Sequence, residues 1–181
     1  IIPSVVNGVS LKTLGSLSFY STGLLSVVIP DTVTTINSRA FNSNSLEEQY
    51  AFIYARKSDG SIDYTTLIGY GGANRGAVTP VEIPQSVNGV TLKTISTSTF
   101  SDTSLKAVII PEGVTRISTS AFASNQLTEV TIPSTVTRID SNAFKKAVNY
   151  NPITKIVNKT GKEFNWKSIT GSTYDATFAT G

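Results

Sequence analysis

The feature that most constrains this chain is a phenylalanine that recurs at a fixed distance from aliphatic residues. Phenylalanine lies five residues after an aliphatic residue at Phe19, Phe41, Phe100, Phe122 and Phe144. At the first four of these positions, a leucine follows five residues later. Such a recurrence is typical of a solenoid, in which small units bury their apolar faces only against each other.

Aligned copies define the repeating unit as LxxVxIPxxVTxIxxxAF, which starts at Leu24, Leu105 and Leu127. Equivalent phenylalanines lie 22 residues apart, as in 41 − 19, 122 − 100 and 144 − 122. This period falls within the range of leucine-rich repeats. Two further copies start at Ile2 and Ile83 and carry five extra residues around Asn-Gly, a pair that favours a tight turn. Because 84 − 3 and 100 − 19 both equal 81, the chain contains a duplicated pair of repeats.

Each unit predicts two short strands that face each other across an apolar interior. The VxI segment is expected to be a strand that pairs in parallel with its copies, and the proline after it ends the strand because proline has no N–H to donate. The VTxI segment, as in Val114–Ile117, is expected on the return side. The five phenylalanines are then predicted to stack as one continuous internal spine.

This pattern resembles the BspA-like leucine-rich repeats of bacterial cell-surface and secreted proteins. The matching segments are the IPxxVTxIxxxAF runs at 29–41, 110–122 and 132–144 and the IPxxVNGVxLKT variants at 2–13 and 83–94. The resemblance implies a mainly β, right-handed leucine-rich-repeat solenoid and a non-catalytic binding role, often adhesion to host or neighbouring-cell proteins. It also implies an extracellular or cell-surface location. Since the chain begins within a repeat, we expect it to be a fragment of a larger bacterial precursor.

The repeat pattern is interrupted between residues 46 and 80 by a tyrosine-rich segment. Strands near 49–56 and 62–70 flank Ser-Asp-Gly-Ser, which predicts a β-hairpin insertion. Tyr50, Phe52 and Tyr54 alternate along the first strand, so they would share one face, and Tyr64 lies on the second. Two interpretations stay open, namely that these aromatic residues complete the core, or that they form a binding platform for a glycan or a peptide.

Beyond Phe144 the pattern decays, and residues 150–181 are interpreted as a C-terminal cap that covers the end of the core. Phe164, Trp166 and Ile169 are the side chains expected to provide this cover. The whole chain is then a single domain over 1–181, with repeats at about 1–46 and 81–149, a hairpin insertion at 47–80 and a cap at 150–181.

A candidate ligand surface follows from the outward position of each VxI strand. It consists of Val28, Glu82, Ile109, Thr131 and Val157, with Glu129 two residues earlier on the same face. Exposed aliphatic residues mixed with carboxylates suit a protein contact. The alternative is that Val, Ile and Thr occupy these positions only because they are favoured in strands.

Composition argues against catalysis, because the chain has no histidine and no cysteine, which removes the commonest general base, metal ligand and strong nucleophile. We therefore expect no catalytic residues, no cofactor and no metal site. Nucleic-acid binding is not expected at a net charge of +3, and no run approaches the ~20 apolar residues that cross a bilayer. The leading hypothesis is an extracellular adhesion module that binds a host or cell-surface protein. The alternatives are a structural spacer and glycan binding through the tyrosine-rich hairpin.

Overall fold

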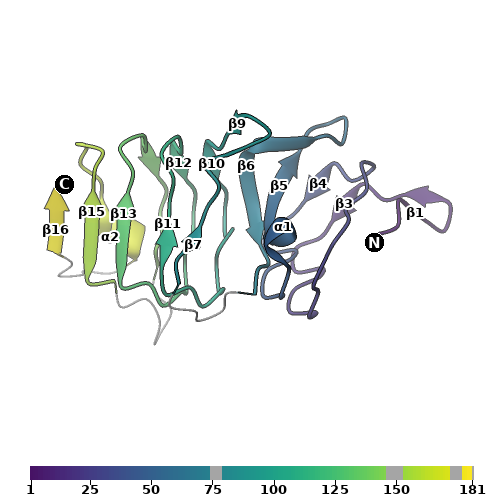
Figure 1. The fold of residues 1–181 in the computed structure, drawn as a ribbon, viewed down its shortest axis with the longest axis horizontal. Coiled ribbons are helices and arrows are strands. Elements are labelled where there is room, and N and C mark those ends of the chain that lie inside the picture. The colour runs from purple at the N-terminus through teal and green to yellow at the C-terminus, as the bar shows by residue number, and fades with distance from the viewer. Residues whose placement is uncertain (74–78, 146–152, 172–176, 181) are drawn as a thin grey trace.

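The computed structural model describes residues 1–73, 79–145 and 153–171 with their side chains, and residues 177–180 as backbone. It is a mainly β solenoid whose repeats stack along the long axis of the molecule (Figure 1). The expected leucine-rich-repeat architecture with short strands is therefore confirmed, while its right-handed sense stays a prediction.

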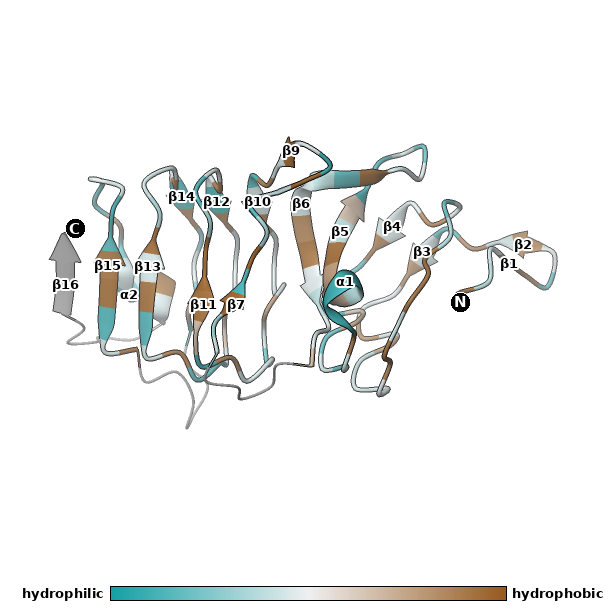
Figure 2. Cartoon of the chain, viewed as in Figure 1, coloured by the Kyte–Doolittle hydropathy of each residue, from teal (hydrophilic) through white to brown (hydrophobic). Residues whose placement is uncertain are grey.

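The VxI segments form one side of the solenoid, which we call the front row. Its strands are β7 (Val81–Glu82), β11 (Val108–Ile109), β13 (Glu129–Ile132), β15 (Lys155–Asn158) and β16 (Thr177–Thr180). β7 pairs with β11 and β13 pairs with β15 in parallel, as predicted for the VxI segments, and β16, which no VxI segment predicted, also pairs in parallel with β15. Figure 2 shows hydrophobic residues on β11, β13 and β15, and in β13 the buried Val130 and Ile132 alternate with the exposed Glu129 and Thr131.

The VTxI segments form the opposite side, the back row. Its repeat strands are β3 (Thr13–Leu14), β4 (Thr35–Ile36), β10 (Thr94–Ile95), β12 (Arg116–Ile117) and β14 (Arg138–Ile139). Thr94 pairs with Arg116, which pairs with Arg138, so the 22-residue sequence period is also the pairing register. The Asn-Gly turns close the antiparallel pairs β1 (Val5–Val6) with β2 (Val9–Ser10) and β8 (Ser86–Val87) with β9 (Val90–Thr91). Asn and Gly have positive φ in both turns, as such tight turns require.

The predicted β-hairpin is present, but it starts later and is more integrated than the sequence indicated. It consists of β5 (Phe52–Arg56) and β6 (Ile62–Tyr70), which are antiparallel. The expected start of the first strand near Gln49 is wrong, because α1 (Glu48–Ala51) forms a helical turn there, closed by the Tyr50 N–H donating to the Glu47 carbonyl at 2.8 Å. β6 also pairs in parallel with β10, so the hairpin fills a place in the back row instead of projecting from it.

The interior contains two aromatic stacks where one continuous spine of phenylalanines was predicted. Phe19 stacks on Phe41 at 5.2 Å, and Phe100, Phe122 and Phe144 stack at 5.0 and 5.2 Å between ring centroids. The prediction of a single spine is wrong because the hairpin stands between Phe41 and Phe100, and Tyr70 of β6 contacts Phe100 instead, at 5.1 Å. The buried core is correspondingly divided into two clusters, one around Phe41 and one around the second stack.

The C-terminal end of the described chain adds a second short helix, α2 (Trp166–Thr170). Asn165 accepts a hydrogen bond from the Ser168 N–H at 3.1 Å, and Gly171 ends the helix with a φ of 71°. Ile169 is buried, and Phe164 and Trp166 pack against the larger cluster. These contacts place the three predicted side chains on the core, while the extent of a cap over 150–181 stays a prediction.

Candidate functional site

The predicted ligand row lies on the outward side of the front row, but the structure divides it. Ile109 is beside Glu82 in the β7–β11 register, and Thr131 is beside Val157 in the β13–β15 register. Val28 lies in the N-terminal repeats, where its carbonyl accepts a hydrogen bond from the Ile2 N–H at 3.0 Å. Five of the six predicted residues therefore lie on front-row strands, whereas Val28 lies outside them, and the ligand surface itself stays a prediction.

The exposure of these residues agrees with an outward orientation. Ile109 of β11 is 48% exposed, and Val28, which lies outside the strands, is 52% exposed. Thr131, Glu82 and Glu129 are also exposed, whereas Val157 is half-buried. The Lys155 ammonium lies 2.9 Å from the Glu129 carboxylate, so that charge already has a partner on the adjacent strand.

A hollow lies beside Ile109 and Thr131, at the end of the front strands. It has a volume of about 390 Å³, and its lining also includes Pro111, Glu112, Pro133 and Lys159. Sequence reasoning missed Glu112 and Lys159, because neither occupies a position that repeats in every unit. The two prolines could have been found, since they end successive strands one period apart.

The carboxylate of Glu112 is held in place at the rim of this hollow. It accepts hydrogen bonds from Ser134 Oγ at 2.9 Å and from the Ser134 N–H at 3.2 Å. Desolvation, the largest single influence, raises the pKa of Glu112, but the hydrogen bonds from Ser134 and Thr135 together lower it. Glu112 is therefore an anion at neutral pH, and no ion pair to Lys159 is present among the described residues.

The four predicted platform residues are half-buried and do not share one strand face. Tyr50 belongs to α1 and packs on the N-terminal cluster, whereas Phe52 and Tyr54 pack on the C-terminal one. Tyr54 meets Tyr64 edge to face at 5.3 Å between centroids. Tyr50, Phe52 and Tyr54 line a small cavity of about 130 Å³ together with Arg56. The platform stays a prediction, and its geometry is a small pocket at the base of the hairpin.

The hydroxyl group of Tyr54 stands out because it is buried and has no hydrogen-bond partner among the described residues. Burial, together with the nearby Tyr64, raises the pKa of Tyr54 to about 12. The phenol is thus neutral at physiological pH and keeps a hydrogen-bond donor to offer.

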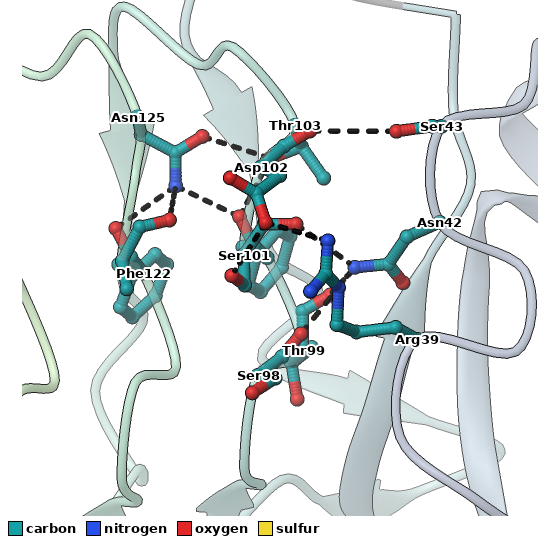
Figure 3. Close-up of polar contacts among 12 residues, drawn as sticks. Arg39, Asn42, Ser43, Ser98, Thr99, Ser101, Asp102, Thr103, Phe122 and Asn125 are labelled. Carbon is teal, nitrogen blue, oxygen red and sulfur yellow. Dashed lines mark hydrogen bonds and ion pairs between the residues drawn. The ribbon is translucent and has the colours of Figure 1, made fainter. Parts of the chain in front are cut away.

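We call the repeats before the hairpin the N-terminal block and the repeats after it the C-terminal block. Polar contacts join the two blocks directly (Figure 3). The Asn42 Nδ2 donates to the carbonyls of Ser98, Thr99 and Ser101 at 3.2–3.3 Å. The Arg39 guanidinium lies 2.5 Å from the Asp102 carboxylate. These residues are 56 to 63 positions apart in sequence, and no pattern in one repeat predicts that they meet.

Two buried asparagines hold the corners of their repeats, and sequence reasoning missed them as well. Asn125 Nδ2 donates to the carbonyls of Phe100 and Phe122, and its Oδ1 accepts from the Leu105 N–H at 3.0 Å. Asn44 makes the equivalent bonds in the N-terminal block. Both asparagines lie three residues after a repeat phenylalanine, which is the signal that could have identified them.

Within the described residues there is no group of three or more Asp, Glu, His or Cys side chains that could hold a metal ion. In the same part of the chain, no helix has the length and apolar character needed to span a membrane.

Comparison with known proteins agrees with this geometry. The family model described as "BspA type Leucine rich repeat region" matches residues 2–52 and 74–170 in 6 copies. No curated protein matches the chain. A solved structure of the pneumococcal vaccine antigen PcpA is similar at 18% identity and a TM-score of 0.48, over 86% of this chain and 44% of that one. Since the family model covers most of its length, the chain belongs to the family of BspA type leucine-rich repeat regions.

Proposed function

We propose that this repeat region is a non-enzymatic, extracellular or cell-surface module that binds a protein partner through its front row. The main observation behind this proposal is that the exposed Ile109 lies beside the hollow that Glu112 and Lys159 line. An apolar centre surrounded by separate charges of both signs has the composition of a protein-recognition surface. Absence of histidine and cysteine from the sequence, together with membership of a repeat family, supports the non-enzymatic part of the proposal.

The recognition surface is defined as Ile109, Thr131, Val157, Glu112 and Lys159. β11 and β13 are adjacent (Figure 1), so Ile109, Thr131 and Val157 lie on the neighbouring strands β11, β13 and β15, and Glu112 and Lys159 follow β11 and β15 in the sequence. A partner with an apolar side chain could fill the hollow while its polar groups meet the carboxylate and the ammonium at the rim. Because Glu112 is already held by Ser134, it loses little side-chain entropy when it binds.

The test begins with a pull-down of extracellular-matrix and serum proteins, followed by binding measurements on each identified partner by biolayer interferometry. Ile109→Lys is expected to weaken binding at least tenfold, because it places a charge at the apolar centre. Val9→Lys is the matched control, since Val9 is an aliphatic residue that is 70% exposed on β2, outside the recognition surface. Equal affinity of the Ile109→Lys variant and the unaltered chain would remove this face as the binding site, and a pull-down that finds no partner would favour the structural spacer.

Glycan binding at the base of the hairpin is the second candidate, and the unpartnered Tyr54 hydroxyl is the observation that favours it. A sugar hydroxyl could accept its hydrogen bond, while Tyr50 and Phe52 supply apolar contact. Tyr54→Phe removes only the hydroxyl, so it is expected to reduce retention on a glycan array and to leave protein binding at the front row unchanged. Retention that does not differ from the unaltered chain would argue against this second candidate.

A further inference from the structure

The hairpin supplies strands to the back row but none to the front row, which stays interrupted. In the back row, β6 pairs with β10, and β5 contacts β4 without pairing with it in the described part of the chain, so the hairpin occupies the place between β4 and β10. In the front row, the repeat pattern after Leu46 would place a strand beside β7, but α1 occupies those residues. Among the described residues, an isolated bridge between Leu46 and Gly72 is the pairing found there. Figure 1 shows α1 at the place where the row of front strands ends.

This interruption leaves one edge of β7 without a partner strand among the described residues. The Val81 N–H donates to the Ala107 carbonyl, and the Ile83 N–H donates to the Ile109 carbonyl, so both point toward β11. Because backbone groups of successive strand residues point to opposite edges, the N–H and C=O of Glu82 point away from β11. No hydrogen bond to either group is formed within the described parts of the chain.

A cavity of about 460 Å³ lies along this edge, and we call it the β7 edge groove. Its apolar lining includes the buried side chains of Leu46, Ala51, Tyr70 and Val81. The groove therefore combines unpaired backbone groups with an apolar floor, which is the combination that an added strand uses in β-augmentation.

The charges of the groove select the occupant. Glu47, Glu48 and Glu82 line it and are exposed, and no Lys or Arg forms an ion pair with them among the described residues. Pro80 has no N–H, and Pro84 follows the strand, so the edge offers room for only a short pairing. An acidic partner strand would be repelled, whereas a basic one would gain electrostatic attraction.

We infer that the β7 edge groove binds a short, extended, basic peptide segment of another protein by strand addition. The backbone of that segment pairs with Glu82, an apolar side chain enters the groove, and Lys or Arg side chains meet the glutamates. This site differs from the recognition surface on β11, β13 and β15, and it does not depend on the proposed function.

The test is an NMR titration of the isotope-labelled chain with the peptide Lys-Val-Lys-Val-Lys-Val, whose two ends are chemically blocked. Amide chemical shifts of the chain are recorded up to millimolar peptide concentrations. Shifts are expected at Val81, Glu82 and α1, and none are expected with the Glu-Val-Glu-Val-Glu-Val counterpart. Glu82→Gln and Glu48→Gln should each weaken binding roughly two- to fivefold, the range for an exposed ion pair. Glu129→Gln is the matched control, because Glu129 is an exposed strand carboxylate outside the groove.

Glu82→Pro separates backbone pairing from charge. It removes the N–H that points into the groove, and an edge strand tolerates proline at such a position. If its melting temperature is unchanged, the Glu82→Pro variant should show no peptide-induced chemical shifts, whereas the Glu82→Gln variant should show them at higher peptide concentrations. Val157→Lys should leave the titration unchanged even if it destroys binding at the recognition surface.

Equal binding of the acidic and basic peptides, or shifts outside the groove, would overturn the inference. A Glu82→Pro variant that is folded and binds as well as Glu82→Gln would also overturn it. If this variant does not fold, the affinities of Glu82→Gln and Glu48→Gln for the basic peptide are compared with that of Glu129→Gln. Equal affinities of the three variants would overturn the inference. Sedimentation that shows a dimer disrupted by Glu82→Gln would assign the edge to a second copy of the chain and refute the basic peptide.

Discussion

Residues 2–13 and 83–94 share the pattern IPxxVNGVxLKT, yet the two copies are buried to different extents. Val9 is 70% exposed and its equivalent Val90 is 38% exposed, while Leu11 is half-buried and Leu92 is fully buried. The C-terminal copy has β6 beside β9, whereas β1 and β2 lie at the N-terminal end of the solenoid (Figure 1). The same local sequence therefore gains different burial from different neighbours, as expected where repeats stabilise one another through their interfaces.

The phenylalanine stacks give the largest expected contrast between the two blocks. Phe122 is fully buried between Phe100 and Phe144, whereas Phe19 is half-buried and stacks on Phe41. Phe122→Ala should lower the free energy of unfolding by roughly 3–5 kcal/mol, the usual range for a buried phenylalanine. Phe19→Ala should lower it by clearly less, because water already reaches that ring. Urea denaturation measures both, and equal losses would contradict the contrast.

The corner asparagines form the same hydrogen bonds in surroundings of different exposure. Asn125→Ala leaves the buried N–H of Leu105 without its acceptor and removes one of the two hydrogen bonds to the Phe100 carbonyl, so it should cost roughly 2–3 kcal/mol. Asn44→Ala should cost less than about 1 kcal/mol, because water can reach its half-buried partner Leu24. Chemical denaturation measures the free energy of unfolding of the two variants. Equal losses would show that exposure at the corner is unimportant.

Asn42 tests whether the blocks unfold together. Asn42→Ala removes the three hydrogen bonds to the C-terminal block and should cost about 1–2 kcal/mol. The N-terminal block should then unfold at lower urea than the C-terminal one. The single tryptophan, Trp166, reports the C-terminal block by fluorescence, while circular dichroism reports the whole chain. Transitions that stay coincident would show that the remaining contacts suffice to couple the blocks.

The smallest expected effect concerns charge on the back row. Arg116 and Arg138 both contact Asp140. In the N-terminal block, Thr35 occupies the position equivalent to Arg116, and Asn37 occupies the position equivalent to Ser118. Desolvation raises the pKa of Asp140, but hydrogen bonds and attraction from the two arginines outweigh it and lower that pKa below its ordinary value.

A carboxyl group with a lowered folded-state pKa stabilises the fold above its unfolded pKa, and this contribution is lost as the pH falls through the folded value. Asp140→Asn should therefore cost about 1 kcal/mol or less at neutral pH, and the difference from the unaltered chain should vanish in acid. Urea denaturation at several pH values measures it, with Asn37→Ala as the uncharged counterpart. A difference that persists in acid would assign the effect to packing.

Much of the fold could be predicted from particular residues. The proline after each VxI segment marks the strand end, and the 22-residue spacing appears directly as the pairing register. The Asn-Gly pairs adopt the tight turns expected of them. These predictions succeed because the same residue type recurs at the same place in every unit, so that each copy supports the others.

The candidate surfaces were predictable only in part. Alternation identified Ile109 and Thr131 as outward residues, but nothing in a single repeat indicates that Lys159 borders the same hollow. The aromatic alternation of Tyr50, Phe52 and Tyr54 was misleading, because Tyr50 belongs to α1 and only Phe52 and Tyr54 lie on β5. Register shifts around Tyr54 change the direction of the strand further.

The sequence by itself determined the repeat, its period, its inward residues and the position of the interruption, because these depend on periodic burial of apolar side chains. Only the tertiary structure decided how the interruption is accommodated. The hairpin extends the C-terminal part of the back row through pairing between β6 and β10, while α1 leaves one edge of β7 without a partner strand among the described residues. That outcome depends on contacts between residues tens of positions apart, such as Asn42 with Ser98, and periodicity within one unit carries no information about them.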